Sequence, residues 1–212
     1  MSENPLPTEM AARRRFFDAQ APHWDDRVDP TSLAADLARE LAALRMRHGD
    51  RILDLGCGTG NLTLALRQTL PPGCRVAALD LSFEMLRRAQ AKLAPADCVD
   101  VLQGDAFHLP FPRGAFDVIL CYSTWPHLEA LGRPERELER VLGRGGRLQV
   151  WHSVGRNRIR EIHGAAGPPV EHDLLPPADR LAERLEAVGL RVERCEDRTD
   201  RYLVRAVKAE TR

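Results

Sequence analysis

The chain has 212 residues, and its 31 Lys and Arg balance 31 Asp and Glu to give no formal net charge at pH 7. This length favours one domain, alone or with a cap, that can bury a sizeable core. Binding to nucleic acid or to an anionic membrane surface normally needs a basic excess, so the balanced charge disfavours both partners and indicates a small-molecule partner.

The N-terminal part of the chain, residues 1–48, is expected to form a helical cap. Its first thirty residues are polar apart from a short stretch that bears aromatic side chains. Thr31 or Ser32 can then cap a helix whose leucines recur at helical spacing and which we expect to end near Gly49.

From residue 49 short apolar runs alternate with helical stretches, which predicts an α/β domain over residues 49–208. Such alternation is typical of a doubly wound sheet with helices on both faces, and the last two runs suit an antiparallel hairpin. The expected strands are 51–55, 75–80, 98–104, 116–122, 147–152, 190–196 and 202–207, with helices over 61–70, after Ser82, over 134–142 and before Gly189. Residues 153–177, rich in Gly, Pro and His, are expected to form a loop insertion.

The strongest local signal is the sequence DLGCGTG at residues 54–60, where a buried strand turns into a helix. Glycines there let the backbone turn tightly and approach a ligand without a Cβ in the way. In open α/β sheets this turn lies at the carboxyl ends of the strands, where ligands bind. Asn61 replaces the third glycine of a dinucleotide fingerprint, and the Gly-Lys-Ser/Thr ending of a P-loop is absent, so neither phosphate-binding motif is complete.

Two further acids end neighbouring strands. Asp80 ends the second strand, where a carboxylate can accept from both hydroxyls of a ribose, and Asp105 follows the third, where it can accept from an exocyclic amine. Each acid taken alone would equally well cap the following turn. Together with Asp54, these strand-end acids beside one glycine loop favour a nucleoside ligand.

The glycine loop and the residues 76–85, 103–106 and 109–111 resemble those of class I S-adenosylmethionine-dependent methyltransferases. The resemblance is nearest to the small-molecule branch that includes the ubiquinone and menaquinone methyltransferases, and it covers about residues 16–207. It implies a Rossmann-like sheet of seven strands with the last strand antiparallel, S-adenosylmethionine as the cofactor, and methyl transfer to a small-molecule acceptor.

The resemblance also implies which residues bind the cofactor. Asp54 and the backbone of residues 56–60 would hold the methionine moiety, Asp80 the ribose, and Asp105 with Ala106 the adenine. Apolar residues after Asp80 would pack on the adenosine, and aromatic residues of the cap would close over it. The full expected set is Asp54, Gly56, Cys57, Gly58, Gly60, Asp80, Leu81, Met85, Asp105, Ala106, Cys121, Phe16 and Trp24.

Methyl transfer from a sulfonium is a direct displacement, so a general base is needed only when the nucleophile carries a proton. Histidine suits that role because its pKa lies near working pH. The candidates are His127, after the fourth strand, and His152, at the end of the fifth; the competing interpretation of His127 is a loop side chain that only hydrogen-bonds. Trp125, His163 and Arg156 are expected to contact the acceptor.

A metal site is a separate hypothesis, which the sequence does not predict firmly. His152, His163, His172 and Asp173 fall in or beside one irregular segment, and imidazoles with carboxylates commonly bind zinc or iron. Their spacing matches no compact metal-binding motif, so surface or substrate-contacting histidines remain the alternative.

Two other functional classes compete with a small-molecule methyltransferase. A protein on this fold could hold the cofactor or a metal without transferring a methyl group, because fold does not fix function. A nucleic-acid or protein methyltransferase is disfavoured by the balanced charge and by the absence of an Asn-Pro-Pro-Tyr-type tetrapeptide after the fourth strand.

The cysteines and the apolar runs predict a cytoplasmic location. The five cysteines are scattered, odd in number and without a Cys-x-x-Cys pair, so we expect reduced and mostly buried thiols. No secretory signal is visible, and no apolar run approaches the roughly 20 residues of a membrane span.

Overall fold

The computed structural model describes residues 7–27, 29–94 and 97–210 of the chain. Within them seven strands form one sheet in the order β3-β2-β1-β4-β5-β7-β6. The strands are β1 (Arg51–Leu55), β2 (Arg75–Asp80), β3 (Val99–Gln103), β4 (Phe116–Tyr122), β5 (Leu142–His152), β6 (Leu190–Asp197) and β7 (Tyr202–Lys208). The helices are α1 (Pro7–Gln20), α2 (Pro30–Leu44), α3 (Asn61–Thr69), α4 (Phe83–Leu93), α5 (Trp125–Leu131), α6 (Glu135–Val141), α7 (Arg156–Ala166) and α8 (Ala178–Ala187), and two 3-10 turns, η1 (Ala21–His23) and η2 (Asp25–Arg27), follow α1.

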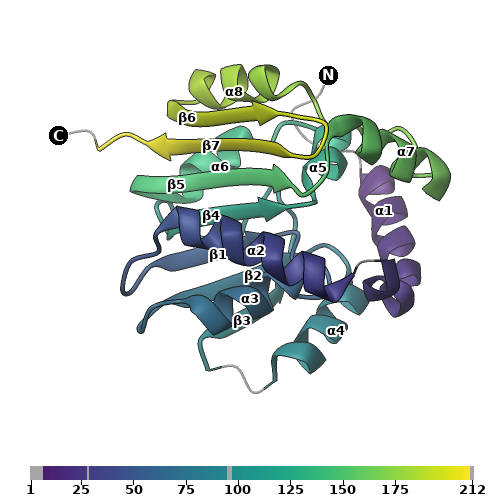
Figure 1. Cartoon of the computed structure of the whole chain (residues 1–212), viewed down its shortest axis with the longest axis horizontal. Coiled ribbons are helices and arrows are strands. Elements are labelled where there is room, and N and C mark those ends of the chain that lie inside the picture. Colours follow the sequence, from purple (N-terminus) through teal and green to yellow (C-terminus); the bar gives the residue numbers. More distant parts are fainter. Residues whose placement is uncertain (1–6, 28, 95–96, 211–212) are drawn as a thin grey trace.

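The predicted α/β sheet is confirmed, including its antiparallel last strand. Strands β1 to β5 pair in parallel, while β7 runs antiparallel to both β5 and β6. Because β7 inserts between β5 and β6, the outer strand of the terminal hairpin is β6. Helices cover both faces of the sheet (Figure 1).

Two apolar layers hold the helices on the sheet. Leu41 of α2 and Leu66 of α3 pack with Ile52 of β1 on one face, whereas Leu138 of α6 packs with Leu53 on the other. Ile52 and Leu53 are adjacent in sequence and point to opposite faces, as the pleat of a strand requires. Strand β1 is therefore buried on both sides, which explains why it has adjacent large apolar residues and not a strict alternation of apolar and polar ones.

The region expected to be a loop insertion, residues 153–177, contains the helix α7, so that expectation was wrong in its first half. Ile159 and His163 are the buried residues of this helix, one turn apart, while the apolar Ile162 between them is exposed and most of the other side chains are polar. A single buried residue per turn gives a weak helical period, and the glycines and prolines after it masked the signal. Helix α5 was also missed. It spans only residues 125–131, which is too short to show a helical period in the sequence.

Only part of the predicted cap, residues 1–48, lies over the carboxyl end of the sheet. Helix α1 and the two 3-10 turns lie there, whereas α2 belongs to the layer that covers one sheet face (Figure 1). The N-cap of α2 is Asp29, whose side chain accepts from the amide of Ser32 at 2.8 Å, so neither Thr31 nor Ser32 caps this helix. Residues 1–6 of the predicted cap lie outside the described residues.

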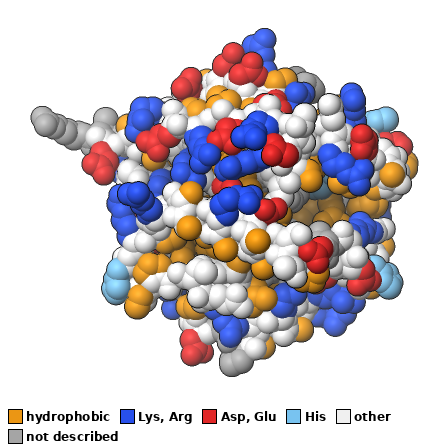
Figure 2. All heavy atoms as spheres, in the orientation of Figure 1, with side chains coloured by type: hydrophobic (Ala, Val, Ile, Leu, Met, Phe, Trp, Pro, Cys, Tyr) orange, Lys and Arg blue, Asp and Glu red, His pale blue; other side chains and the backbone are white. Residues whose placement is uncertain are grey.

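Positive and negative side chains are interspersed over the face in Figure 2, without a continuous field of either sign. None of the helices that the structure describes combines the length and the apolar character needed to cross a bilayer. All five cysteines are free thiols, and three of them, Cys57, Cys74 and Cys121, are buried. This agrees with the expectation of mostly buried thiols.

Candidate active site

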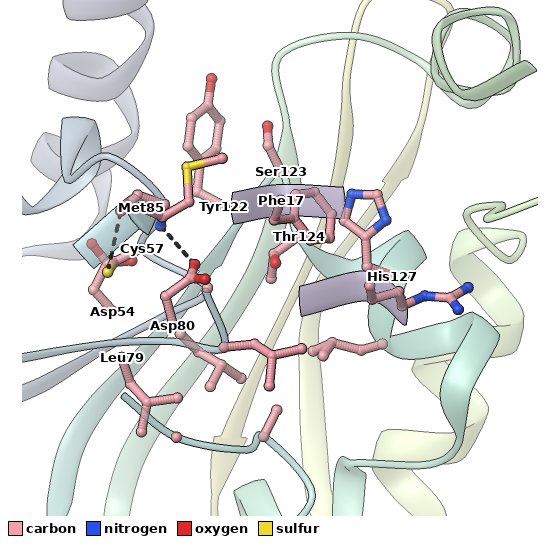
Figure 3. Close-up of a pocket in the computed structure, with 18 of the residues that line it drawn as sticks. Phe17, Asp54, Cys57, Leu79, Asp80, Met85, Tyr122, Ser123, Thr124 and His127 are labelled. Atoms are coloured by element: carbon pink, nitrogen blue, oxygen red, sulfur yellow. Dashed lines mark hydrogen bonds between the residues drawn. The ribbon is translucent and has the colours of Figure 1, made fainter. Parts of the chain in front are cut away.

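A pocket opens at the carboxyl ends of β1, β2 and β4, where the glycine loop, the cap and the start of α5 meet (Figure 3). It contains about 1030 Å³ of empty space, part of which is open to solvent. Its walls are largely apolar with a few converging polar groups, which is the usual composition of a small-molecule site. The side chains that line it include Met10, Arg13, Phe17, Trp24, Asp54, Asp80, Leu81, Met85, Asp105, Ala106, Phe107, Thr124, His127, Leu128 and Leu131.

The glycine loop closes one side of this pocket, and Gly56 is its most constrained position. Its φ is +71°, and a Cβ built there would lie 2.2 Å from Oγ1 of Thr124. The amides of Gly56 and Cys57 donate to the carbonyl of Leu79, at 2.8 and 3.1 Å, which ties the loop to β2. The loop therefore fits beneath Thr124 only with glycine at position 56.

Asp80 is fixed by the backbone around it. One carboxylate oxygen accepts from the amide of Gly58 at 2.8 Å, and the other accepts from the amide of Ser82 at 2.9 Å. Burial raises the pKa of Asp80, while these two amides act in the opposite direction. The carboxylate is thus oriented in advance at the pocket wall and keeps lone pairs for a ligand's hydroxyl groups.

Asp54 is fully enclosed beneath the glycine loop. Oγ1 of Thr63 donates to it at 2.6 Å. Burial, with a smaller contribution from the negative charge of Asp80, raises the pKa of Asp54 from 3.8 to about 7. A cationic ligand beside this carboxyl would favour its ionised form.

We expect Asp54→Asn to stabilise the unliganded protein above pH 7. The raised pKa means that the folded protein keeps a proton which the unfolded chain releases near pH 4, so the free energy of unfolding falls as pH rises through about 7. Asparagine cannot ionise, and its carbonyl can still accept from Thr63. Thermal unfolding should give equal Tm values for the two proteins near pH 4 and a Tm at least about 3 °C higher for the variant at pH 8; a lower Tm at pH 8 would contradict the assigned pKa.

The cap is anchored over the pocket by two aspartates. Asp18 of α1 accepts from Oγ of Ser82 at 2.6 Å and from the amide of Glu84 at 3.2 Å, at the N-terminus of α4. Asp25 of η2 accepts from Oγ1 of Thr59 at 2.6 Å and from Nζ of Lys92 at 2.8 Å. The cap is therefore held on the same two segments, the glycine loop and the start of α4, that form the pocket wall.

Most residues expected to bind the cofactor meet in this one pocket. Ten of them line it: Asp54, Gly56, Cys57, Gly58, Asp80, Leu81, Met85, Asp105, Ala106 and Trp24. Gly60, Cys121 and Phe16 do not. Cys121 lies in the core because alternate residues of β4 face opposite sides of the sheet, and Phe16 packs edge-on against Phe17, which takes the lining position.

His127 of α5 lies on the side of the pocket opposite Asp54 and Asp80 (Figure 3). Its Nδ1 is 2.7 Å from Oδ2 of Asp173. The centroid of its ring lies 4.9 Å from the ring centroid of Phe17 and 4.8 Å from that of His163. The other oxygen of Asp173 accepts from the guanidinium of Arg13. The structure thus places the first candidate base in the pocket with a carboxylate behind it.

The second candidate base, His152, was assigned wrongly. It is 1% exposed and does not line the pocket, and burial lowers its pKa to about 3. Neither ring nitrogen has a hydrogen-bond partner among the described residues. His152 is therefore a neutral core side chain, because the sheet face onto which it points is covered.

None of the three residues expected to contact the acceptor lines the pocket. Trp125 is completely buried in the core at the start of α5. Arg156 bonds Asp197 at 3.3 Å and the carbonyl of Leu175 at 3.2 Å, away from the pocket. His163 lies behind His127, with Nδ1 2.6 Å from the carbonyl oxygen of Asp173. These expectations treated residues 125 and 153–177 as loop. In the structure Trp125 belongs to α5, and Arg156 and His163 belong to α7, and these helices direct the three side chains away from the pocket.

The hypothetical metal ligands do not converge. His172 is exposed beside Glu171, while the imidazole of His163 donates to a main-chain carbonyl. In the part of the chain that the structure describes, no three His, Cys, Asp or Glu side chains are grouped to hold a metal ion. The four candidates, His152, His163, His172 and Asp173, are thus close in sequence without forming a ligand set.

Two lining residues of the cap, Met10 and Arg13, were not anticipated, whereas Phe17 was expected to belong to the part of the cap that closes over the cofactor. All three lie on one face of α1 at spacings of three and four residues. Ser123 and Thr124 follow β4, which is the neighbour of β1 in the sheet, so their position was available from the strand order alone.

Comparison with known proteins places this geometry among methyltransferases. Residues 53–150 match the family described as "Methyltransferase domain". The chain is 34% identical over 190 residues to the 27-O-demethylrifamycin SV methyltransferase of Amycolatopsis mediterranei, covering 82% of this chain and 67% of that protein. It is 31% identical over 141 residues to the demethylmenaquinone methyltransferase of Lactobacillus johnsonii, covering 64% of this chain but only 58% of the relative, so it spans less than two thirds of that protein.

Solved structures repeat the fold over nearly their whole length. An S-adenosylmethionine-dependent methyltransferase from Aquifex aeolicus matches with a TM-score of 0.65 and 24% identity, over 85% of this chain and 98% of that one. The 4+2 cyclase SpnF matches with a TM-score of 0.70 and 23% identity, over 98% and 99% of the two chains. At these identities the likeness shows the fold and not the reaction.

Proposed function

This chain belongs to the class I S-adenosylmethionine-dependent methyltransferases, and on that premise we propose that it transfers a methyl group to a small-molecule acceptor. The observation that supports the proposal most directly is the position of Asp80, held by the amides of Gly58 and Ser82 at the wall of a pocket that the cap covers. When bound, S-adenosylmethionine supplies an electrophilic methyl carbon and leaves as a neutral thioether.

The residues of the pocket suit this cofactor chemically. The carboxylate of Asp80 can accept from the ribose hydroxyls, and the acids Asp54 and Asp80 offset the positive charges of a sulfonium and an ammonium group. Leu81 and Met85 provide apolar surface for the adenine ring. One oxygen of Asp105 accepts from the amide of Phe107 at 2.8 Å and the other lies 3.0 Å from Nδ1 of His108; each oxygen has a second lone pair that can accept from an exocyclic amine.

The remaining part of the pocket is proposed to hold the acceptor. Met10, Phe17, Phe107, Leu128 and Leu131 line it, which suits a molecule with an apolar body. His127 is the one imidazole among the described residues that line the pocket, and we assign it the role of general base toward an acceptor that carries a proton.

Asp80→Ala is the direct test of the cofactor assignment. Loss of the ribose-binding carboxylate should weaken S-adenosylmethionine binding at least about tenfold, as measured by calorimetry. Asp100→Ala is the matched control, because Asp100 lies on β3, away from the pocket, and pairs with Arg75 at the surface at 3.2 Å. Unchanged affinity in the Asp80 variant would refute the ribose assignment.

A protein that binds the cofactor without transferring its methyl group is the competing proposal. The two differ in product: incubation with labelled S-adenosylmethionine and candidate acceptors yields S-adenosylhomocysteine and a methylated acceptor only in the first case. We favour methyl transfer because His127 and Asp173 are arranged for proton transfer beside the cofactor site.

We further propose that the protein works in the cytoplasm and does not act on nucleic acid. Its cysteines are free thiols, the chain carries no net charge, and on the face in Figure 2 positive side chains are interspersed with negative ones, which does not favour binding to a phosphate backbone.

A further inference from the structure

Two segments far apart in the sequence, α1 and α5, converge on the carboxylate of Asp173, which follows α7. Arg13 of α1 donates to Oδ1, and Nδ1 of His127 lies 2.7 Å from Oδ2. His163 of α7 contacts the main-chain carbonyl of the same residue at 2.6 Å. Asp173 is 1% exposed, so all of its oxygen atoms find their partners inside the protein.

These contacts fix the tautomer of His127. An ionised carboxylate only accepts hydrogen bonds, so the nitrogen that faces Asp173 must carry the hydrogen. The neutral imidazole then keeps its lone pair on Nε2. Arg13 supplies the paired cation that a buried carboxylate such as Asp173 needs.

The other titratable groups around His127 do not compete for its proton. His163 stacks on its ring, and burial together with His127 lowers the pKa of His163, so this neighbour is neutral. His152 on β5 is neutral as well. Asp173 and Arg13 form a pair of zero net charge, and the acid Asp80 faces the ring from β2. The His127 ring thus meets the carboxylate of Asp173 at hydrogen-bond distance and has Asp80 on the other side of the pocket.

We propose that Asp173, held by Arg13, is a positioning residue that sets Nε2 of His127 as a proton acceptor, and that the acceptor molecule presents a hydroxyl group there. This inference rests on the proposed function. A carboxylate acceptor has no proton to lose, and a neutral amine attacks through its lone pair, so an oriented base is most useful to an alcohol or a phenol. As the oxygen–carbon bond forms, the carbon–sulfur bond breaks with its electron pair going to sulfur, and the hydroxyl proton passes to Nε2.

The tautomer can be measured without cofactor or acceptor. Proton–nitrogen correlation spectra of protein with isotope-labelled histidine should show His127 protonated on Nδ1. In Asp173→Asn the proton should redistribute between the two nitrogens, because an amide can donate as well as accept. His172→Gln, an exposed neighbour of Asp173, is the matched control and should leave the His127 signals unchanged. A wild-type His127 protonated on Nε2 would overturn the proposal.

The second measurement is turnover with matched probes: 2-naphthol, 2-naphthylamine and 2-naphthoate, each with S-adenosylmethionine. We expect methylation of the naphthol, a decrease in kcat of at least about 100-fold in Asp173→Asn, and a cofactor Kd within about twofold of the wild type. Arg13→Gln should reproduce the tautomer change with a smaller loss, which covers the case that Asp173→Asn fails to fold.

The outcomes separate this inference from the proposed function. Methylation of the amine or the carboxylate in preference to the naphthol, or equal turnover in Asp173→Asn at every pH, would overturn the inference and leave a methyltransferase. Failure to bind S-adenosylmethionine would refute the proposed function, whereas the tautomer measurement on the unliganded protein would still decide the role of Asp173.

Discussion

Gly56→Ala is expected to weaken S-adenosylmethionine binding by at least about 100-fold, the equivalent of about 3 kcal/mol. The added Cβ would lie 2.2 Å from Oγ1 and 2.7 Å from Cβ of Thr124, so the loop or the start of α5 must move. A non-glycine residue at a φ of +71° adds a strain of roughly 1–2 kcal/mol. Both effects displace the backbone that carries Gly58 and its bond to Asp80.

Calorimetry at a temperature where the variant remains folded is the measurement. Gly164→Ala provides the control, because a Cβ there meets nothing within 4 Å and its cofactor affinity should be unchanged. Adding Thr124→Gly to Gly56→Ala removes the clash but not the backbone strain, so part of the affinity should return. Wild-type affinity in Gly56→Ala would mean that the glycine loop does not contact the cofactor.

His127→Gln is expected to lower kcat by at least about 100-fold, with the cofactor Kd within about twofold of the wild type. The reason is that glutamine keeps a polar side chain of similar length but cannot take a proton at neutral pH. His127 is the histidine that reaches the pocket, while Asp54 and Asp80 lie on the opposite side and should keep their hold on the cofactor (Figure 3).

The comparison is made under saturating cofactor, with the naphthol probe and with His172→Gln as the control. A lower kcat accompanied by a large loss of cofactor affinity would point to a binding role for His127 instead of proton transfer. If His127→Gln turned over as fast as the wild type, His127 would have no part in the mechanism. The interpretation of His127 as a side chain that only hydrogen-bonds would then hold.

The strands and the proposed cofactor pocket could be predicted because their signals are local. A largely apolar segment such as residues 51–55 predicts a buried strand whatever surrounds it. Because the strands are parallel and in register, the acids at their carboxyl ends lie along one edge of the sheet. Asp54 pairs opposite Ala78 in β2, and Asp80 pairs opposite Gln103 in β3, so these acids had to meet near the glycine loop. Ten of the thirteen residues expected to bind the cofactor line the pocket for this reason.

The catalytic assignments needed information that no local pattern holds. Trp125 and His127 are two residues apart, and which of them reached the pocket depended on the first turn of α5: the indole entered the core and the imidazole did not. His152 ends a strand as Asp80 does, yet the pleat of β5 turns its ring onto a covered face. The position of a residue in the sequence therefore predicted that it lies at the carboxyl end of the sheet, but not whether its side chain points into the pocket or into the core.

The α/β sheet, the glycine loop and the acids beside it follow from local patterns in the sequence, because strand period and strand-end register are properties of neighbouring residues. Which side chains face the pocket depends instead on how the elements pack against one another. The bond between Arg13 and Asp173 joins residues 160 positions apart, and the contact between His127 and Asp173 joins residues 46 apart. Such contacts exist only once α1, α5 and the segment after α7 have packed together over the sheet, since no periodicity links side chains on separate elements.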